Sequence, residues 1–217
     1  LHQSGGYGHK VKRYFCVLMG MRLRASSLGI GMFLLLSAFG LQAQKNQTDS
    51  QGRKQGAWEK TYPDGKLRFK GQFKNDIPIG LFIFYHPNGV KRAENRFRGM
   101  TGVCYSKQFD AEGLLEAEGK YVDQERDSTW LHYDKEKRLI LKEDYMQGKL
   151  HGESISYHEN GNLAEKLHFK NGLRHGPWIR KLDNGTAVVK AEYADDELHG
   201  QAKFWDISGS PVSMGKY

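Results

Sequence analysis

The segment Gly-Ala-Trp-Glu-Lys-Thr-Tyr-Pro-Asp-Gly-Lys-Leu-Arg-Phe-Lys-Gly-Gln-Phe, residues 56–73, carries the pattern that decides the fold: a strand, a tight turn and a second strand. Its turn glycine and the aromatic residue eight positions later both return every 24 residues. The glycines are Gly65, Gly89, Gly113, Gly161, Gly185 and Gly209, with Lys137 in the fourth unit. The aromatics are Phe73, Phe97, Tyr121, Tyr145, Phe169, Tyr193 and Tyr217. A fixed period of this length indicates a repeat array in which each unit packs mainly on its neighbours.

The chemistry of the turns agrees with this period. They read Pro-Asp-Gly at 63–65, Pro-Asn-Gly at 87–89, Glu-Asn-Gly at 159–161 and Asp-Asn-Gly at 183–185. Proline presets φ near about −65°, Asn or Asp suits the next position, and glycine takes the left-handed position that closes a three-residue hairpin loop. We expect the six glycines to be structural turn residues, and Lys137 to hold a positive φ if its turn keeps the same geometry.

The second strand of each unit alternates in polarity. Leu67, Phe69, Gly71 and Phe73 point one way, and the polar residues between them point the other way. Period two throughout residues 56–217 predicts an all-β fold, an elongated antiparallel meander of about seven 24-residue β-hairpin repeats. The third unit is irregular between Phe97 and Gly113, and we expect a longer or bulged strand there.

The N-terminal residues predict export. We interpret residues 1–20 as upstream translation and residues 21–43 as a signal peptide, with a basic start, an apolar stretch and a small residue at Ala43. An uncleaved N-terminal anchor is the alternative. Residues 44–55 are polar and predict a flexible lead-in. The expected location is periplasmic, outer-membrane-associated or secreted.

Charge is distributed unevenly over the remaining chain. Residues 44–217 hold 28 basic and 25 acidic residues, a net charge of +3, without the strong basic stripe that nucleic-acid binding requires. Residues 44–109 have a net charge of +8 and residues 110–217 a net charge of −5. We therefore expect Arg92, Arg96 and Arg98 to meet an anionic envelope polymer, an acidic lipid or the acidic half of a second copy. Ordinary solvation of a polar face is the alternative.

Aromatic residues occupy two repeat phases on opposite sides of the first strand. One phase holds Trp58, Phe82, Trp130 and Trp178; the other holds Tyr85, Phe109, Tyr133, Tyr157 and Trp205. The set that shares a face with the second-strand aromatics should form the core. The other should be a binding stripe or be covered by curling or self-association. We take the first set, here called the Trp58 set (Trp58, Phe82, Trp130 and Trp178), together with the three arginines, as candidate binding residues.

Catalytic and metal-binding patterns are missing from the sequence. His151, His175 and His199 recur with the repeat, but equivalent positions in successive hairpins lie two strands, about 9.5 Å, apart. One zinc ion could not hold them at bonds of about 2 Å. We expect Cys104 to be a half-buried residue that fills space in the packing of the third unit. No nucleophile elbow or phosphate-binding glycine loop occurs, so we expect a non-enzymatic protein without metal or cofactor.

Three segments resemble the MORN-variant repeat: residues 56–67, 157–163 and 169–178. The resemblance extends over residues 56–217 and is clearest in the first, fifth and sixth units. It implies a β-hairpin array that acts as a protein- or lipid-contacting scaffold without activity of its own. In bacteria such repeats are often labelled YwqK-family antitoxins, which implies a toxin partner. The expected function is an exported scaffold for protein or envelope interactions. The alternatives are an antitoxin and a glycan-active surface protein; a homodimer and a peripheral membrane contact both remain open.

Overall fold

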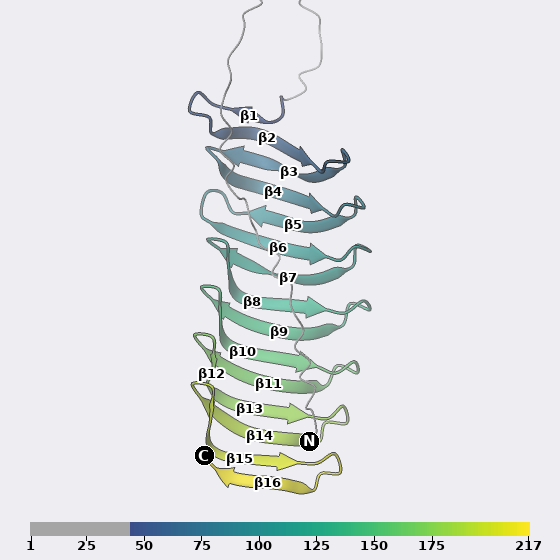
Figure 1. Cartoon of the computed structure of the whole chain (residues 1–217), viewed down its shortest axis with the longest axis vertical. Helices are drawn as coiled ribbons and strands as arrows, with labels where there is room; N and C mark the ends of the chain where they lie inside the picture. Colours follow the sequence, from purple (N-terminus) through teal and green to yellow (C-terminus); the bar gives the residue numbers. More distant parts are fainter. Residues whose placement is uncertain (1–43) are drawn as a thin grey trace, which may run out of the picture. The chain divides into compact units, whose positions relative to one another are not determined.

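The computed structural model describes residues 44–217, which form a single open antiparallel sheet (Figure 1). The predictions for residues 1–20 and 21–43 lie outside the described residues. The strands are β1 (Gln47–Thr48), β2 (Lys54–Thr61), β3 (Leu67–Lys74), β4 (Ile77–Tyr85), β5 (Lys91–Phe97), β6 (Val103–Phe109), β7 (Leu115–Val122), β8 (Glu125–Tyr133), β9 (Leu139–Met146), β10 (Lys149–Tyr157), β11 (Leu163–Lys170), β12 (Leu173–Arg174), β13 (Gly176–Lys181), β14 (Ala187–Ala194), β15 (Glu197–Trp205) and β16 (Pro211–Lys216).

Strand order in the sheet follows the chain, except that β12 pairs only with β11. The predicted all-β meander of hairpins is therefore confirmed. The lead-in differs from the prediction, because residues 44–55 contain β1 and the start of β2 rather than a flexible segment. Asp49 helps to hold the backbone of this segment in place, because its carboxylate accepts hydrogen bonds from the backbone amides of Gln51 and Arg53.

Two kinds of turn form the two edges of the sheet (Figure 1). At the edge drawn on the right, five-residue segments such as Tyr62–Lys66 close each hairpin, and the six turn glycines have φ between 82° and 88°. Lys137 has φ 63° at the equivalent position, which is the left-handed conformation expected from the period. At the opposite edge, two-residue turns such as Asn75-Asp76 have positive φ at both positions, as in a type I′ turn.

Side chains at the glycine-turn edge join each unit to the next. The Tyr62 hydroxyl donates to the Tyr85 carbonyl over 2.7 Å. At the equivalent positions in other units, His86 Nε2 lies 2.9 Å from the Phe109 carbonyl and His158 Nε2 lies 2.9 Å from the Lys181 carbonyl. These bonds span 23 residues and satisfy a carbonyl in the next hairpin, so they fix the stacking of successive units.

The core lies on one face of the sheet as a column of aromatic rings. Phe82 and Trp130 are 0% exposed. Each ring packs directly over a glycine of the preceding strand, Gly71 for Phe82 and Gly119 for Trp130; a Cβ at either glycine would lie 2.3–2.6 Å from ring atoms. The small residue on the second strand of one unit thus makes room for the large residue on the first strand of the next.

The third unit departs from the prediction. β6 has seven residues, fewer than the nine of β4, β8, β10 and β15, and it pairs with β5 without a register shift. The extra length lies in the loop after β5, where Arg98 donates its amide to the Val103 carbonyl and both Gly99 and Gly102 have positive φ. The predicted longer strand is therefore wrong, because the loop takes up the extra residues. β6 does shift register toward β7 between Gln108 and Phe109, at the position where the neighbouring hairpins shift as well.

Candidate interaction surface

The Trp58 set of aromatics (Trp58, Phe82, Trp130 and Trp178) belongs to the core face. Ring centroids are 5.8 Å apart for Trp58 and Phe73, 5.1 Å for Phe82 and Phe73, 4.8 Å for Trp130 and Tyr121, and 5.4 Å for Trp178 and Tyr193. This set therefore shares its face with the second-strand aromatics, the arrangement expected of core residues. Phe82 and Trp130 have no exposed surface, so a partner could not touch these two side chains in this conformation.

Cations cover the outer side of this column at every second or third unit. The Lys54 ammonium lies 5.0 Å from the Phe73 ring, and the Arg126 and Arg174 guanidinium groups lie 4.2 Å from Trp130 and 4.1 Å from Tyr193. Cation–π contacts of this kind stabilise the rings that they cover. The core face is thus partly closed by the protein's own side chains.

The opposite face carries the exposed arginine of β5. Arg96 lies directly opposite Leu81 on β4 and directly opposite Tyr105 on β6, so these three side chains share a face. Leu81 is 38% exposed and Tyr105 is 51% exposed. An exposed arginine between two exposed apolar groups is a composition enriched in protein interfaces.

The neighbouring loop extends this surface. Arg98 follows directly on β5 and is exposed, and Met100 at the loop tip is 49% exposed. We define the β5 surface as Leu81, Arg96, Arg98, Met100 and Tyr105. Among residues 44–217, neither of its arginines forms an ion pair, whereas the nearby Lys120 is 2.7 Å from Asp127.

Arg92 is not part of the β5 surface. It is half-buried, and its guanidinium lies 5.8 Å from the ring of Phe84, a core-face residue. Of the three arginines predicted to bind a partner, Arg96 and Arg98 are therefore exposed and belong to the β5 surface. Arg92 instead contacts the Phe84 ring.

A second cluster, of charged and polar groups, lies on the core face of β8 and β9. Glu143 Oε2 accepts a hydrogen bond from the Tyr145 hydroxyl over 2.9 Å and lies 3.2 Å from His132 Nε2 and 3.7 Å from Arg126 Nη1. Burial opposes ionisation of Glu143, but the contacts with His132 and Tyr145 and the charge of Arg126 outweigh it and lower the pKa of Glu143. Burial and the charge of Glu143 raise the pKa of Tyr145 to about 12. Sequence reasoning missed this cluster.

The histidines of the repeat turns lie apart from one another. Within the described part of the chain, no group of three or more His, Cys, Asp or Glu side chains could hold a metal ion. His175 Nδ1 lies 3.3 Å from Asp195 Oδ1, and His151 Nδ1 accepts from the Asn171 amide. Cys104 is buried between Phe97 and Tyr121 in the core.

Comparison with known families gives matches to the MORN repeat variant at residues 54–75 and 150–171. Each match covers one hairpin, β2–β3 and β10–β11, and together they support a MORN-repeat protein. Comparison with curated proteins gives no match. No helix of residues 44–217 is long and apolar enough to cross a membrane.

Solved structures similar to parts of this chain include a mutant of S. aureus TarM in complex with fondaparinux, α-GlcNAc-glycerol and UDP. The identity is 11% and the TM-score is 0.34, over 44% of this chain and 19% of that chain. A second TarM structure matches at 14% identity and a TM-score of 0.32, over 43% and 20%. The chain thus spans about a fifth of the length of the TarM chains it matches.

Proposed function

We propose that this protein is an exported, non-enzymatic repeat scaffold that binds an anionic component of the cell envelope through the β5 surface. The MORN-variant matches support a repeat scaffold for binding. The observation that carries the finer proposal is the exposed pair Arg96 and Arg98, which the described residues leave without an acidic partner beside exposed Leu81 and Tyr105.

The charge distribution favours an anionic partner. Residues 44–109 carry a net charge of +8, and Arg96 and Arg98 lie on a face that the aromatic core does not occupy. Basic patches on an otherwise balanced protein raise the local concentration of anionic partners and speed their association. The apolar side chains beside the arginines add contact area once the partner has arrived.

Vesicle binding tests this proposal. Purified protein is mixed with phosphatidylcholine vesicles that contain or lack phosphatidylglycerol, and bound protein is measured by sedimentation over a range of salt concentrations. We expect binding to the anionic vesicles only, with release by about 0.5 M salt because exposed charges are screened over a few ångströms there. Binding to both vesicle types, or binding that salt does not weaken, would contradict an anionic partner.

A further inference from the structure

The sheet contains a hollow at its C-terminal end, beside the glycine turns that follow β10, β13 and β15. Its volume is about 430 Å³, within the range of about 300–1,000 Å³ of pockets that bind small molecules. Its walls include polar residues of three strands, Ser156, Glu165 and Arg180. They also include the apolar residues Leu182 and Ile207 at turns and Val188 near the start of β14. The hollow lies far along the chain from the β5 surface and none of its lining residues belongs to that surface.

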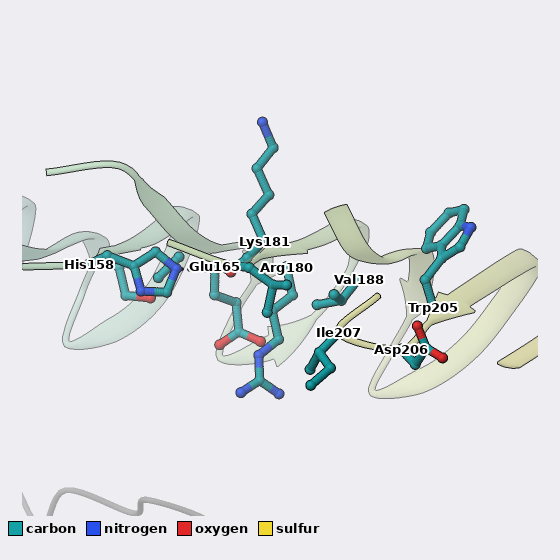
Figure 2. A pocket seen from close by; sticks show the side chains of 11 residues that line it. His158, Glu165, Arg180, Lys181, Val188, Trp205, Asp206 and Ile207 are labelled. Atoms are coloured by element: carbon teal, nitrogen blue, oxygen red, sulfur yellow. Dashed lines mark hydrogen bonds between the residues drawn. The ribbon is translucent and has the colours of Figure 1, made fainter. Parts of the chain in front are cut away.

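Glu165 and Arg180 give this hollow its chemical character. They lie directly opposite each other on β11 and β13, and Figure 2 shows both side chains projecting to the side on which Ile207 lies. Glu165 Oε1 accepts a hydrogen bond from the Trp178 indole N–H over 2.8 Å. Within the described range 44–217, Glu165 and Arg180 form no ion pair with each other, and the Arg180 guanidinium has no hydrogen-bond partner. The second carboxylate oxygen and the guanidinium donors are therefore both available to a ligand.

The turns around the hollow are held in place. The Asp206 carboxylate accepts hydrogen bonds from the backbone amides of Ser208 and Ser210 over 2.8 and 2.9 Å. These bonds fix the segment that carries Ile207. His158 Nε2, on the other side, contacts the Lys181 carbonyl. Lys181 and Trp205 also line the hollow, but Figure 2 shows their side chains extending to the opposite side of the ribbon.

Glu165 and Arg180, which project to the same side of the ribbon, balance each other in charge, while the Asp206 carboxylate is engaged by the amides of Ser208 and Ser210. A carboxylate oxygen accepts hydrogen bonds and a guanidinium donates up to five, while Ser156 offers a hydroxyl that does both. The carboxylate of Glu165 would repel an anionic ligand, and the guanidinium of Arg180 would repel a cationic ligand. A neutral molecule with several hydroxyl groups satisfies both side chains, and its C–H surface can pack on Val188, Leu182 and Ile207.

From this combination we infer that the hollow is a binding site for a neutral saccharide, which it holds without chemical change. The Glu165 carboxylate accepts from sugar hydroxyls, Arg180 donates to sugar oxygens, and the apolar turn residues contact one face of the ring. This inference does not depend on the β5 surface or on an anionic partner.

Calorimetric titration with neutral oligosaccharides tests the inference. The probes are cello-, chito-, malto- and manno-oligosaccharides, with galacturonate oligomers as the anionic comparison. We expect at least one neutral series to bind, and Arg180→Gln and Glu165→Gln each to weaken that binding about tenfold, because each removes a hydrogen bond to a charged group. Glu165→Gln keeps a side-chain oxygen that can accept from Trp178, so the local fold is retained.

Lys190→Gln is the matched control, since it removes an exposed cation of the same sheet region outside the hollow. Its binding should equal that of the unmodified protein. The inference is overturned if no neutral oligosaccharide binds, if only the galacturonate oligomers bind, or if neutral binding survives both Arg180→Gln and Glu165→Gln. Circular dichroism of each variant confirms that the sheet is intact.

Discussion

Gly119→Ala tests how the core column is packed. Gly119 does not have a positive φ, so its backbone accepts alanine, and in a strand alanine is favoured over glycine by about 0.5–1 kcal/mol. The new Cβ would nevertheless lie 2.3, 2.5 and 2.6 Å from three atoms of the Trp130 ring. The ring cannot move away easily, because its Nε1 donates to the Lys120 carbonyl over 3.0 Å, the Tyr121 ring packs against it in a T-shaped arrangement and the Arg126 guanidinium lies over it.

Overpacking of this kind costs about 1–3 kcal/mol. The fixed ring places the expected cost near the upper end, so that a net loss of about 2 kcal/mol in the free energy of unfolding remains after the gain in strand propensity. Equilibrium unfolding in urea, followed by far-ultraviolet circular dichroism, measures this loss.

A double-mutant cycle separates the ring contact from other effects. Trp130→Ala alone should cost about 3–5 kcal/mol, and Gly119→Ala should add no further loss in that background because the space is then open. Gly161→Ala is the control. Gly161 has φ 82°, and no atom would lie within 4 Å of an added Cβ, so the cost of this substitution is backbone strain and should not depend on Trp130. The reasoning is refuted if Gly119→Ala is neutral with Trp130 present, or costs as much without it.

Three further outcomes follow from the described contacts. Lys137→Gly should raise the free energy of unfolding by about 1 kcal/mol in the same urea assay, because the lysine holds φ 63°, and a loss would show that its side chain stabilises the turn. Tyr62→Phe should lower it by about 0.5–1.5 kcal/mol, the worth of the hydrogen bond to the Tyr85 carbonyl, and an unchanged value would show that this bond does not help to join the units. The folded-state pKa of Glu143 lies below its ordinary value of 4.5, so its contribution is present above pH 4.5 and is lost as the pH falls through the folded pKa. Melting temperatures measured from neutral pH downward should therefore fall less steeply below pH 4.5 for Glu143→Gln than for the unmodified protein, and parallel curves would contradict this account.

The period and turn chemistry were sufficient to predict the sheet. Glycine at residue 65 and its equivalents requires a left-handed turn, and alternation in residues 66–73 requires a strand, so both features are local and visible in one unit. The left-handed conformation of Lys137 follows from the same register. The third unit could not be predicted correctly, because a loop and a bulge can each absorb two residues and only tertiary packing decides between them.

The candidate sites were less predictable because they depend on pairing between strands. Gly71 and Gly119 were a signal in the sequence: a glycine on the second strand indicates that a large ring of the next unit packs over it, which places Phe82 and Trp130 in the core. The Glu143 cluster carried no such signal, since His132 and Glu143 come from different strands and meet only in the folded register. The hollow near Glu165 and Arg180 likewise depends on how three turns are placed.

Charge reversal on the β5 surface tests the central claim most directly. Arg96→Glu with Arg98→Glu is compared with Lys190→Glu with Lys203→Glu, which makes the same change in net charge at two exposed lysines of β14 and β15 on the same face. Dissociation constants for phosphatidylglycerol-containing vesicles are measured for both variants and the unmodified protein. The account predicts that the arginine variant loses binding and that the lysine variant keeps most of it. Equal losses in the two variants, or full binding by the arginine variant, would contradict it.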